Sequence, residues 1–182
     1  MPVLENDIVK LRAVEPEDIE LLYNWENDTD NWMISNTIVP FSRYILRKFV
    51  ENSFQDIYEL KQMRLMIDEK QLINGKCLTV GSVDLFDFDP FHQRAGIGIL
   101  IHAQTNRRKH FATYSLQLLI NYCFDILKLH QVYCNILAEN EASIKLFTNL
   151  GFEKVGIKKQ WVKSLHGWSD EVMFQLINPA FV

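Results

Sequence analysis

Residues 140–152 read Asn-Glu-Ala-Ser-Ile-Lys-Leu-Phe-Thr-Asn-Leu-Gly-Phe, and this stretch decides the fold. Asn140 is suited to cap a helix, because its side-chain oxygen can accept a hydrogen bond from a free backbone N–H of the first turn. Gly151 is suited to end that helix, because glycine adopts the left-handed conformation without steric cost. The pattern therefore predicts a capped amphipathic helix over 141–150, followed by a strand from Phe152 to Ile157.

The clearest helix precedes this stretch. Apolar residues recur at i, i+3, i+4, i+7, i+8 and i+11 over 116–127, which is the spacing of one helix face. Apolar segments flank this helix over 95–101 and 130–137, and both are predicted to be strands. Gly96 and Gly98 interrupt the first of these strands, which indicates a bulge or a close approach of backbone.

The remaining elements extend the pattern toward both ends of the chain. Further strands are predicted at 8–13, 64–67, 77–88 and 172–177. Further helices are predicted from Glu15 onward and over 42–54, with a polar loop over 27–40 between them. Asn74-Gly75 is typical of a hairpin turn. The order β-α-α-β-β-β-α-β-α-β-β predicts an α/β fold, with a sheet of mixed direction and helices on its faces.

Composition limits the classes of protein to which the chain can belong. Its 182 residues are 48% hydrophobic and 23% charged, as in ordinary globular proteins, so a single domain over 1–182 is expected. The net charge of −4 argues against a nucleic-acid binder, which usually carries a basic surplus. The N-terminus lacks the pattern of a signal peptide, and no apolar run is long enough to span a bilayer. We expect a cytoplasmic protein without membrane contact, whose three cysteines are reduced and buried.

Four basic residues, Arg107-Arg108-Lys109-His110, stand at the start of the helix that runs through Leu127. Cationic side chains are unfavourable at a helix N-terminus, which already carries partial positive charge and unpaired amides. A bound phosphate would make these basic side chains favourable instead, because they and the unpaired amides together form a binding site for an anion. A solvated basic patch that tolerates the cost explains these residues equally well.

In this order, the features resemble a known family. The run from His92 to about Phe152 is similar to the GNAT superfamily of acyl-CoA-dependent N-acetyltransferases, and most to its branch of bacterial spermidine and ribosomal-protein N-terminal acetyltransferases. The pattern N-E-x-S-I-x-L-x-x-x-L-G-F over 140–152 is the most specific match, and residues 10–18 are similar to the start of that branch. The resemblance implies a central mixed, largely antiparallel sheet flanked by helices.

The resemblance also implies residue roles toward acetyl-CoA, the expected co-substrate. The strand Ile99-Leu100-Ile101 should hydrogen-bond the pantetheine arm, and one of its amides should polarise the thioester carbonyl. Asn140 should contact the pantetheine, with Ser143 and Lys145 near the CoA. The pyrophosphate loop of the family corresponds to Arg107, Arg108, Lys109, His110, Phe111 and Ala112, and Thr113 begins the helix proper.

Two positions depart from the family pattern. His110 stands where the loop carries glycine, and a β-carbon there restricts positive φ. Phe147 stands where relatives often carry the Tyr that protonates the leaving thiolate. Either Ser143 or another donor such as Tyr114 or Tyr133 replaces that Tyr, or solvent does, or the chemistry is lost.

The implied chemistry calls for a base. A primary amine with a pKa of about 10.4 is neutral in only about one part in 10³ at pH 7, and only the neutral amine attacks a thioester. Asp84, Asp87 and Glu139 are the candidate bases, although each is also explained as a plain surface carboxylate. The five histidines form no ligand pattern, so no metal is expected.

The leading hypothesis is therefore an acetyl-CoA-dependent N-acetyltransferase acting directly on a primary amine, either of a polyamine-like small molecule or of a protein N-terminus. One rival is a weakly active or inactive acyl-CoA-binding module, which Phe147 and His110 motivate. Another is a transferase of a different acyl group. The connection between the last two strands is expected to serve packing, to cover the acceptor cleft, or to form a contact in a homo-oligomer, and it holds Trp161, His166, Trp168 and Asp170.

Overall fold

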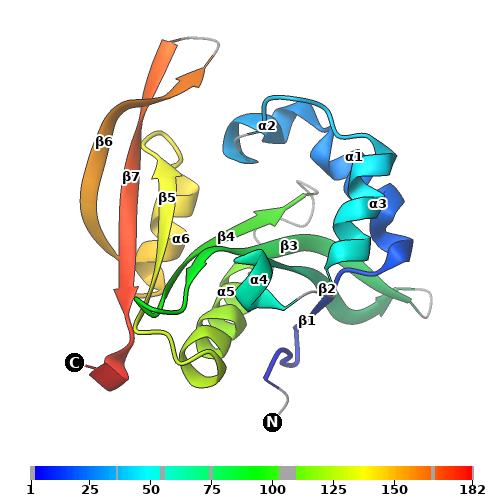
Figure 1. The fold of residues 1–182 in the computed structure, drawn as a ribbon, viewed down its shortest axis with the longest axis horizontal. Helices are drawn as coiled ribbons and strands as arrows, with labels where there is room; N and C mark the ends of the chain where they lie inside the picture. Colours follow the sequence, from blue (N-terminus) through cyan, green and yellow to red (C-terminus); the bar gives the residue numbers. More distant parts are fainter. Residues whose placement is uncertain are drawn as a thin grey trace.

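One sheet organises the part of the chain that the computed structural model describes, residues 3–35, 37–53, 56–73, 76–102, 110–164 and 167–181 (Figure 1). The seven strands found there lie in the order β1-β2-β3-β4-β5-β7-β6. Their bounds are β1 (Val9–Ala13), β2 (Met63–Ile73), β3 (Lys76–Asp89), β4 (Arg94–Ile101), β5 (Gln131–Leu137), β6 (Glu153–Ser164) and β7 (Gly167–Ile177). Every neighbouring pair is antiparallel except β4 and β5, so the predicted mixed, largely antiparallel α/β fold is confirmed.

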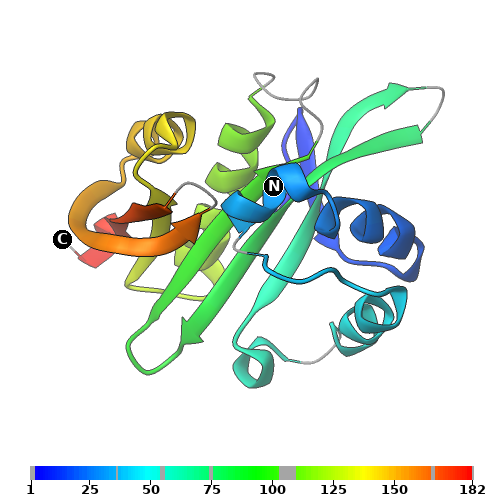
Figure 2. The same ribbon diagram turned by 90° about the horizontal axis from the view of Figure 1, so that it is seen from above.

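Helices cover both faces of this sheet (Figure 2). They are α1 (Ile19–Glu26), α2 (Thr29–Ser35), α3 (Arg43–Asn52), α4 (Ile57–Leu60), α5 (Phe111–Asn121) and α6 (Glu141–Asn149), with single turns at Pro16–Asp18, Tyr122–Ile126 and Pro179–Phe181. Side chains alternate across a strand, and β2 therefore serves two cores. Leu65 and Ile67 belong to the larger core with α5, whereas Met66 packs with Leu22 of α1 and Leu46 of α3.

β4 and β5 are the parallel pair of the sheet, and their ladder is short. Its three residue pairs end at Gly96 and Tyr133. Beyond that point β4 stays paired with β3 as far as Ile101, and β5 stays paired with β7 as far as Leu137. Because each strand follows its outer neighbour, the two strands diverge and the sheet opens between them (Figure 1).

The predicted loop over 27–40 is wrong in part, because residues 29–35 form α2. Asp28 holds the first turn of this helix, its Oδ1 accepting from the Asp30 N–H at 3.1 Å. The Trp32 indole N–H donates to the Glu26 carbonyl at 2.8 Å. Hydrogen bonds from side chain to backbone therefore stabilise a short polar helix whose apolar residues show no helical period.

The last two strands are longer than predicted. Trp161, Trp168 and Asp170 lie within β6 and β7 rather than in a connection, whereas His166 lies outside the described residues. β6 bulges after residue 158, where Gln160 has a φ of 48° and donates its N–H to Asp170 Oδ1 at 2.9 Å. The bulge interrupts the alternation of side chains, which is why the sequence pattern does not show the strand.

Gly96 and Gly98 of β4 pair in register with Phe86 and Asp84 of β3, and the ladder bulges immediately beyond Gly96, on the β3 side between Phe86 and Asp89. A methyl group added at Gly96 would lie 2.2–2.6 Å from three atoms of the Phe86 ring, so the predicted close approach is present at this glycine. The Asn74-Gly75 turn lies outside the described residues, but Ile73 and Lys76 pair on either side of it.

The three cysteines are free thiols, and two of them are buried. Burial raises the pKa of Cys123 and of Cys134 to about 12. Cys77 is exposed, so the prediction of a buried thiol is wrong for this residue, which stands beside the β2–β3 turn. Among the described helices, none is long and apolar enough to cross a membrane.

Arg12 connects the N-terminal helices to the sheet. From β1 its guanidinium donates to both oxygens of Asp18, at 2.7 and 2.9 Å, and to Asp68 of β2 at 2.7 Å. Asp18 also accepts from the backbone N–H of Glu15 and so completes a capping box. Burial opposes ionisation of Asp18, but the bonds from Arg12 and Glu15 outweigh it and hold the pKa of that carboxyl below its usual value.

Asp18→Asn should lower the free energy of unfolding by about 2 kcal/mol at pH 7, because Arg12 loses a charged acceptor. The lowered pKa means that ionised Asp18 stabilises the fold above its unfolded pKa of about 3.9, and that this stabilisation is lost as the pH falls through the folded pKa. Urea unfolding of the variant and the wild type should therefore converge in acid. Glu20→Gln, which breaks the exposed pair with Arg43, should leave the transition unchanged. A difference for Asp18→Asn that persists unchanged in acid would contradict this account.

Candidate functional site

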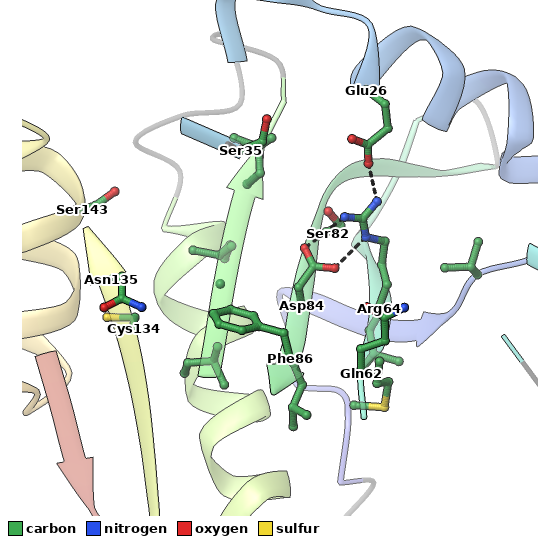
Figure 3. A pocket seen from close by; sticks show the side chains of 18 of the residues that line it. Glu26, Ser35, Gln62, Arg64, Ser82, Asp84, Phe86, Cys134, Asn135 and Ser143 are labelled. Atoms are coloured by element: carbon green, nitrogen blue, oxygen red, sulfur yellow. Dashed lines mark hydrogen bonds and ion pairs between the residues drawn. The ribbon is translucent and has the colours of Figure 1, made fainter. Parts of the chain in front are cut away.

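A cavity of about 870 Å³ lies where β4 and β5 separate (Figure 3). Both diverging strands line it, β4 with residues 97–100 and β5 with residues 134–137. α6 contributes side chains from one side, and α1, β2 and β3 contribute charged side chains from the other. Figure 3 shows Ser143 on the first side, facing Arg64, Asp84 and Glu26 across the space.

The inner edges of the two strands are polar. Beyond Gly96 and Tyr133 the ladder between them has ended, so backbone groups along these edges face the cavity rather than a neighbouring strand. Buried backbone N–H and C=O groups need partners, and an extended chain bearing amides would supply them. Ile99 and Leu100, two of the three residues predicted to bind the pantetheine arm, line the cavity, whereas Ile101 is 8% exposed and lies outside the lining.

α6 places Asn140, Ser143 and Phe147 on the cavity wall. Asn140 caps the helix as predicted, its Oδ1 accepting from the Ser143 N–H at 3.1 Å. Ser143 and Phe147 lie four residues apart and therefore share one side of the helix. Phe147 is 4% exposed and packs edge-on against Phe152, with ring centroids 5.1 Å apart. Lys145, which was predicted to lie near the CoA, is exposed and outside the lining.

The predicted phosphate-binding end of α5 is described in part. His110 has a φ of 62°, so it adopts the left-handed conformation that the glycine of the family pattern would adopt. Phe111 is buried, and Ala112 and Thr113 are half-buried in the first turn. The basic residues at 107–109 lie outside the described residues, and their part in the cradle stays a prediction.

Arg64 holds two carboxylates together on the wall opposite α6. Its Nε donates to Asp84 Oδ1 at 2.6 Å, and its Nη1 donates to Glu26 Oε1. Burial alone would lower the pKa of Arg64, but the two carboxylates outweigh it and raise that pKa above its usual value. The three side chains are 15–31% exposed, so solvent screens them only in part. Two carboxylates and one guanidinium leave this cluster with a net charge of −1.

Another carboxylate stands on the β7 wall. Glu171 accepts from Lys158 Nζ at 2.8 Å, and Lys158 also donates to Asn135 Oδ1 at 3.0 Å. Asn135 and Glu171 both line the cavity. Sequence reasoning missed these two residues, and it missed Glu26 and Arg64 as well. Strand register and helix placement bring the four together, and no local motif marks them.

Of the three carboxylates predicted as bases, Asp84 lines the cavity and the other two do not. Asp87 is exposed and accepts from the Tyr133 hydroxyl at 3.1 Å. Glu139 is exposed in the turn before α6, where a hydrogen bond from Ser169 at 2.5 Å lowers its pKa. Tyr133, an alternative proton donor, lies outside the lining, and burial raises its pKa to about 12.

Comparison with known proteins shows the family to which this chain belongs. Residues 9–153 match the model of the acetyltransferase (GNAT) domain. The chain is 27% identical over 151 residues to a spermidine N(1)-acetyltransferase of Vibrio cholerae, covering 83% of this chain and 82% of the relative. It is 26% identical over 184 residues to an uncharacterised N-acetyltransferase of Bacillus licheniformis, covering 100% of this chain and 99% of the relative.

Solved structures share the fold. A crystal structure of spermidine N-acetyltransferase from Vibrio cholerae in complex with CoA and spermine has a TM-score of 0.83 at 22% identity, over 94% of this chain and 96% of that chain. A dodecameric structure of spermidine N-acetyltransferase from Vibrio cholerae has a TM-score of 0.75 at 21% identity, over 97% of this chain and 98% of that chain.

Arg64→Met should lower the free energy of unfolding by about 3 kcal/mol, because it leaves Glu26 and Asp84 in the cavity wall without their cation. The triple variant Arg64→Met, Glu26→Gln, Asp84→Asn should recover most of that loss, because both uncompensated charges are then removed. Urea unfolding at pH 7 measures the two differences. Equal stability of the single and triple variants would show that charge compensation is not what Arg64 contributes.

Proposed function

Because this chain belongs to the GNAT family of N-acetyltransferases, we propose that it transfers the acetyl group of acetyl-CoA directly to a primary amine of a polyamine-like small molecule. The observation that carries this proposal is the cavity between β4 and β5, which joins polar strand edges on one side to a negatively charged cluster on the other. A protein N-terminus, the other acceptor expected from the sequence, is distinguished by the experiment below.

The residues around the cavity suit an acyl-CoA. When bound, acetyl-CoA supplies a thioester whose carbonyl carbon an amine can attack. The edge of β4 at Ile99 and Leu100 offers backbone groups to the amides of the pantetheine arm, much as a sheet edge binds an added strand. The first turn of α5, after the left-handed His110, presents backbone N–H groups that suit the pyrophosphate together with the basic residues at 107–109.

The acceptor side of the cavity carries excess negative charge. Glu26 and Asp84 line it with Arg64 between them, and the net charge of −1 of this cluster attracts an ammonium group, whereas Glu171 on the β7 wall is neutralised by Lys158. Asp84 lies in register with Gly98 of β4, beside the proposed thioester position. In our proposal, Asp84 accepts the proton of the attacking amine directly or through water, and Arg64 orients its carboxylate.

Transfer forms a C–N bond and breaks a C–S bond, so the amine releases one proton and the departing thiolate takes up another. Of the donors expected from the sequence, Ser143 lines the cavity, whereas Tyr133 and Tyr114 lie outside its lining. Phe147 has no hydroxyl to donate. We therefore assign the proton for the leaving sulfur to the Ser143 hydroxyl.

Relatives support the choice of acceptor and an assembly of several copies. The Vibrio cholerae relative is a spermidine acetyltransferase, and a dodecameric structure of that enzyme shares this fold. We extend both properties to this chain, as a polyamine acceptor and a homo-oligomer. The proposal includes no metal, nucleic-acid or membrane partner, and the cytoplasmic location stays a prediction.

Thiol release from acetyl-CoA tests this function, with polyamines, amino sugars and peptides bearing free N-termini as separate acceptors. Turnover with polyamines and none with peptides is the expected result. Turnover with peptides alone would move the acceptor to a protein N-terminus. Acetyl-CoA binding measured by calorimetry, with no turnover on any acceptor, would favour the acyl-CoA-binding module that Phe147 motivates.

Asn140→Ala should cost about 1 kcal/mol of stability and also raise KM for acetyl-CoA, because Asn140 both caps α6 and lines the cavity. Ser42→Ala is the matched control. Ser42 caps α3 outside the cavity lining, its Oγ accepting from the Ile45 N–H at 3.2 Å. Urea unfolding should show similar losses for both variants, and initial rates should show a raised KM for Asn140→Ala alone. An unchanged KM would leave Asn140 with the structural role only.

Phe147→Tyr should raise kcat, because a phenolic hydroxyl on the cavity wall adds a proton donor for the thiolate, and such catalysis typically contributes about 10²–10⁴-fold. Ser143→Ala should lower kcat by removing the donor now assigned. Phe152→Tyr adds the same oxygen to the neighbouring ring outside the lining and should leave kcat unchanged. If neither Phe147→Tyr nor Ser143→Ala changes kcat, no proton donor acts from this side of α6.

A further inference from the structure

We propose that Phe86 sets the upper size of the acyl group that this enzyme accepts, by closing the end of the cavity toward which the acyl chain extends. The inference rests on the proposed function, since it concerns the acyl-CoA rather than the amine. It assigns a specificity-determining role to a β3 residue that no sequence motif marks.

The position of the Phe86 ring carries the argument. Ser82, Asp84 and Phe86 alternate along β3, so their side chains point to the same face of the sheet, and all three line the cavity (Figure 3). Phe86 lies in register with Gly96, and Gly96 is also the β4 residue of the last pair with β5. The ring therefore stands at the point where β4 and β5 begin to separate.

Two neighbours hold the ring against the sheet. A methyl group added at Gly96 would lie 2.2–2.6 Å from three ring atoms, whereas one added at Gly98 would lie 3.7 Å from the ring. The ring thus rests directly on the backbone at Gly96, in space that a side chain would otherwise fill. Tyr133 of β5 meets it edge-on with centroids 6.1 Å apart, and the Tyr133 hydroxyl is fixed by its bond to Asp87. Phe86 therefore lines this end of the cavity, and Tyr133 packs against its ring from outside the lining.

Chain direction places the acyl group toward that end. β4 runs from Arg94 to Ile101 and leads into the start of α5, where the pyrophosphate is proposed to bind. A pantetheine arm that begins there passes Leu100 and Ile99 before it reaches Gly98. Its acyl group then points toward Gly96 and the Phe86 ring. Each further methylene would have to displace this ring, and a tight apolar site typically discriminates one methylene by about 10–200-fold.

Binding tests the inference without any need for turnover. Calorimetry with acetyl-CoA and butyryl-CoA should show at least about tenfold weaker binding of butyryl-CoA to the wild type. Phe86→Leu should reduce that ratio at least about threefold. Initial rates with acetyl-CoA, propionyl-CoA and butyryl-CoA should shift in the same direction for kcat/KM.

Phe88→Leu is the matched control, because it removes a phenyl ring from the same strand but outside the cavity lining. Phe88 is 3% exposed and packs edge-on to Tyr58, with centroids 5.1 Å apart. The control should lose stability yet keep the wild-type ratio between the two acyl-CoAs. Gly96→Ala tests the same ring in a second way, because the added methyl group must push the Phe86 ring into the cavity. This variant should therefore bind acetyl-CoA itself more weakly than the wild type does.

An acyl-CoA ratio that is the same in Phe86→Leu and Phe88→Leu would overturn the inference and leave the acetyltransferase proposal standing. If Phe86→Leu does not fold, undiminished acetyl-CoA binding by Gly96→Ala would overturn it equally. Failure of the wild type to bind any CoA thioester would instead remove the proposed function, and this inference with it.

Discussion

The structure depends on the early end of the ladder between β4 and β5. A parallel pair that continued along both strands would satisfy their inner edges and leave no space between them. Here β4 follows β3 and β5 follows β7, and the pairing stops at Gly96 and Tyr133. The opening exposes backbone polar groups to a cavity, and it lets α6 on one side face the charged side chains of β2, β3 and α1 on the other.

One guanidinium partly compensates the two carboxylates on the cavity wall. A partly buried carboxylate is costly without a partner, and a fully compensated pair would not attract a cation. Arg64 lies between Asp84 and Glu26, so the cluster is stabilised by hydrogen bonds and still carries a net charge of −1. Asp84 and Phe86 stand two residues apart on one face of β3, which places the proposed proton acceptor and the proposed acyl limit on a single strand.

Whether a predicted site residue reaches the cavity depends on the local geometry of its helix or strand. Asn140, Ser143 and Phe147 reach the cavity together because they lie three and four residues apart on one helix. Lys145 stands two residues after Ser143 and is turned away by the same helical period. Asp87 is three residues from Asp84 on a strand, where alternation favours the opposite face, and its left-handed φ of 50° lies at the bulge of β3 between Phe86 and Asp89.

The local sequence patterns predicted most of the elements and their order, but they missed the short helices α2 and α4. Caps, glycine stops and apolar periods act over a few residues, and they located α6, α5, the β2–β3 hairpin and most strands. The tertiary structure alone decided the register of the sheet, the divergence of β4 and β5, and the residues that meet in the cavity. Arg64 bonds Asp84 across 20 residues of sequence and Glu26 across 38. Such contacts depend on how the packing of the whole chain places one strand against another, and no short segment contains that information.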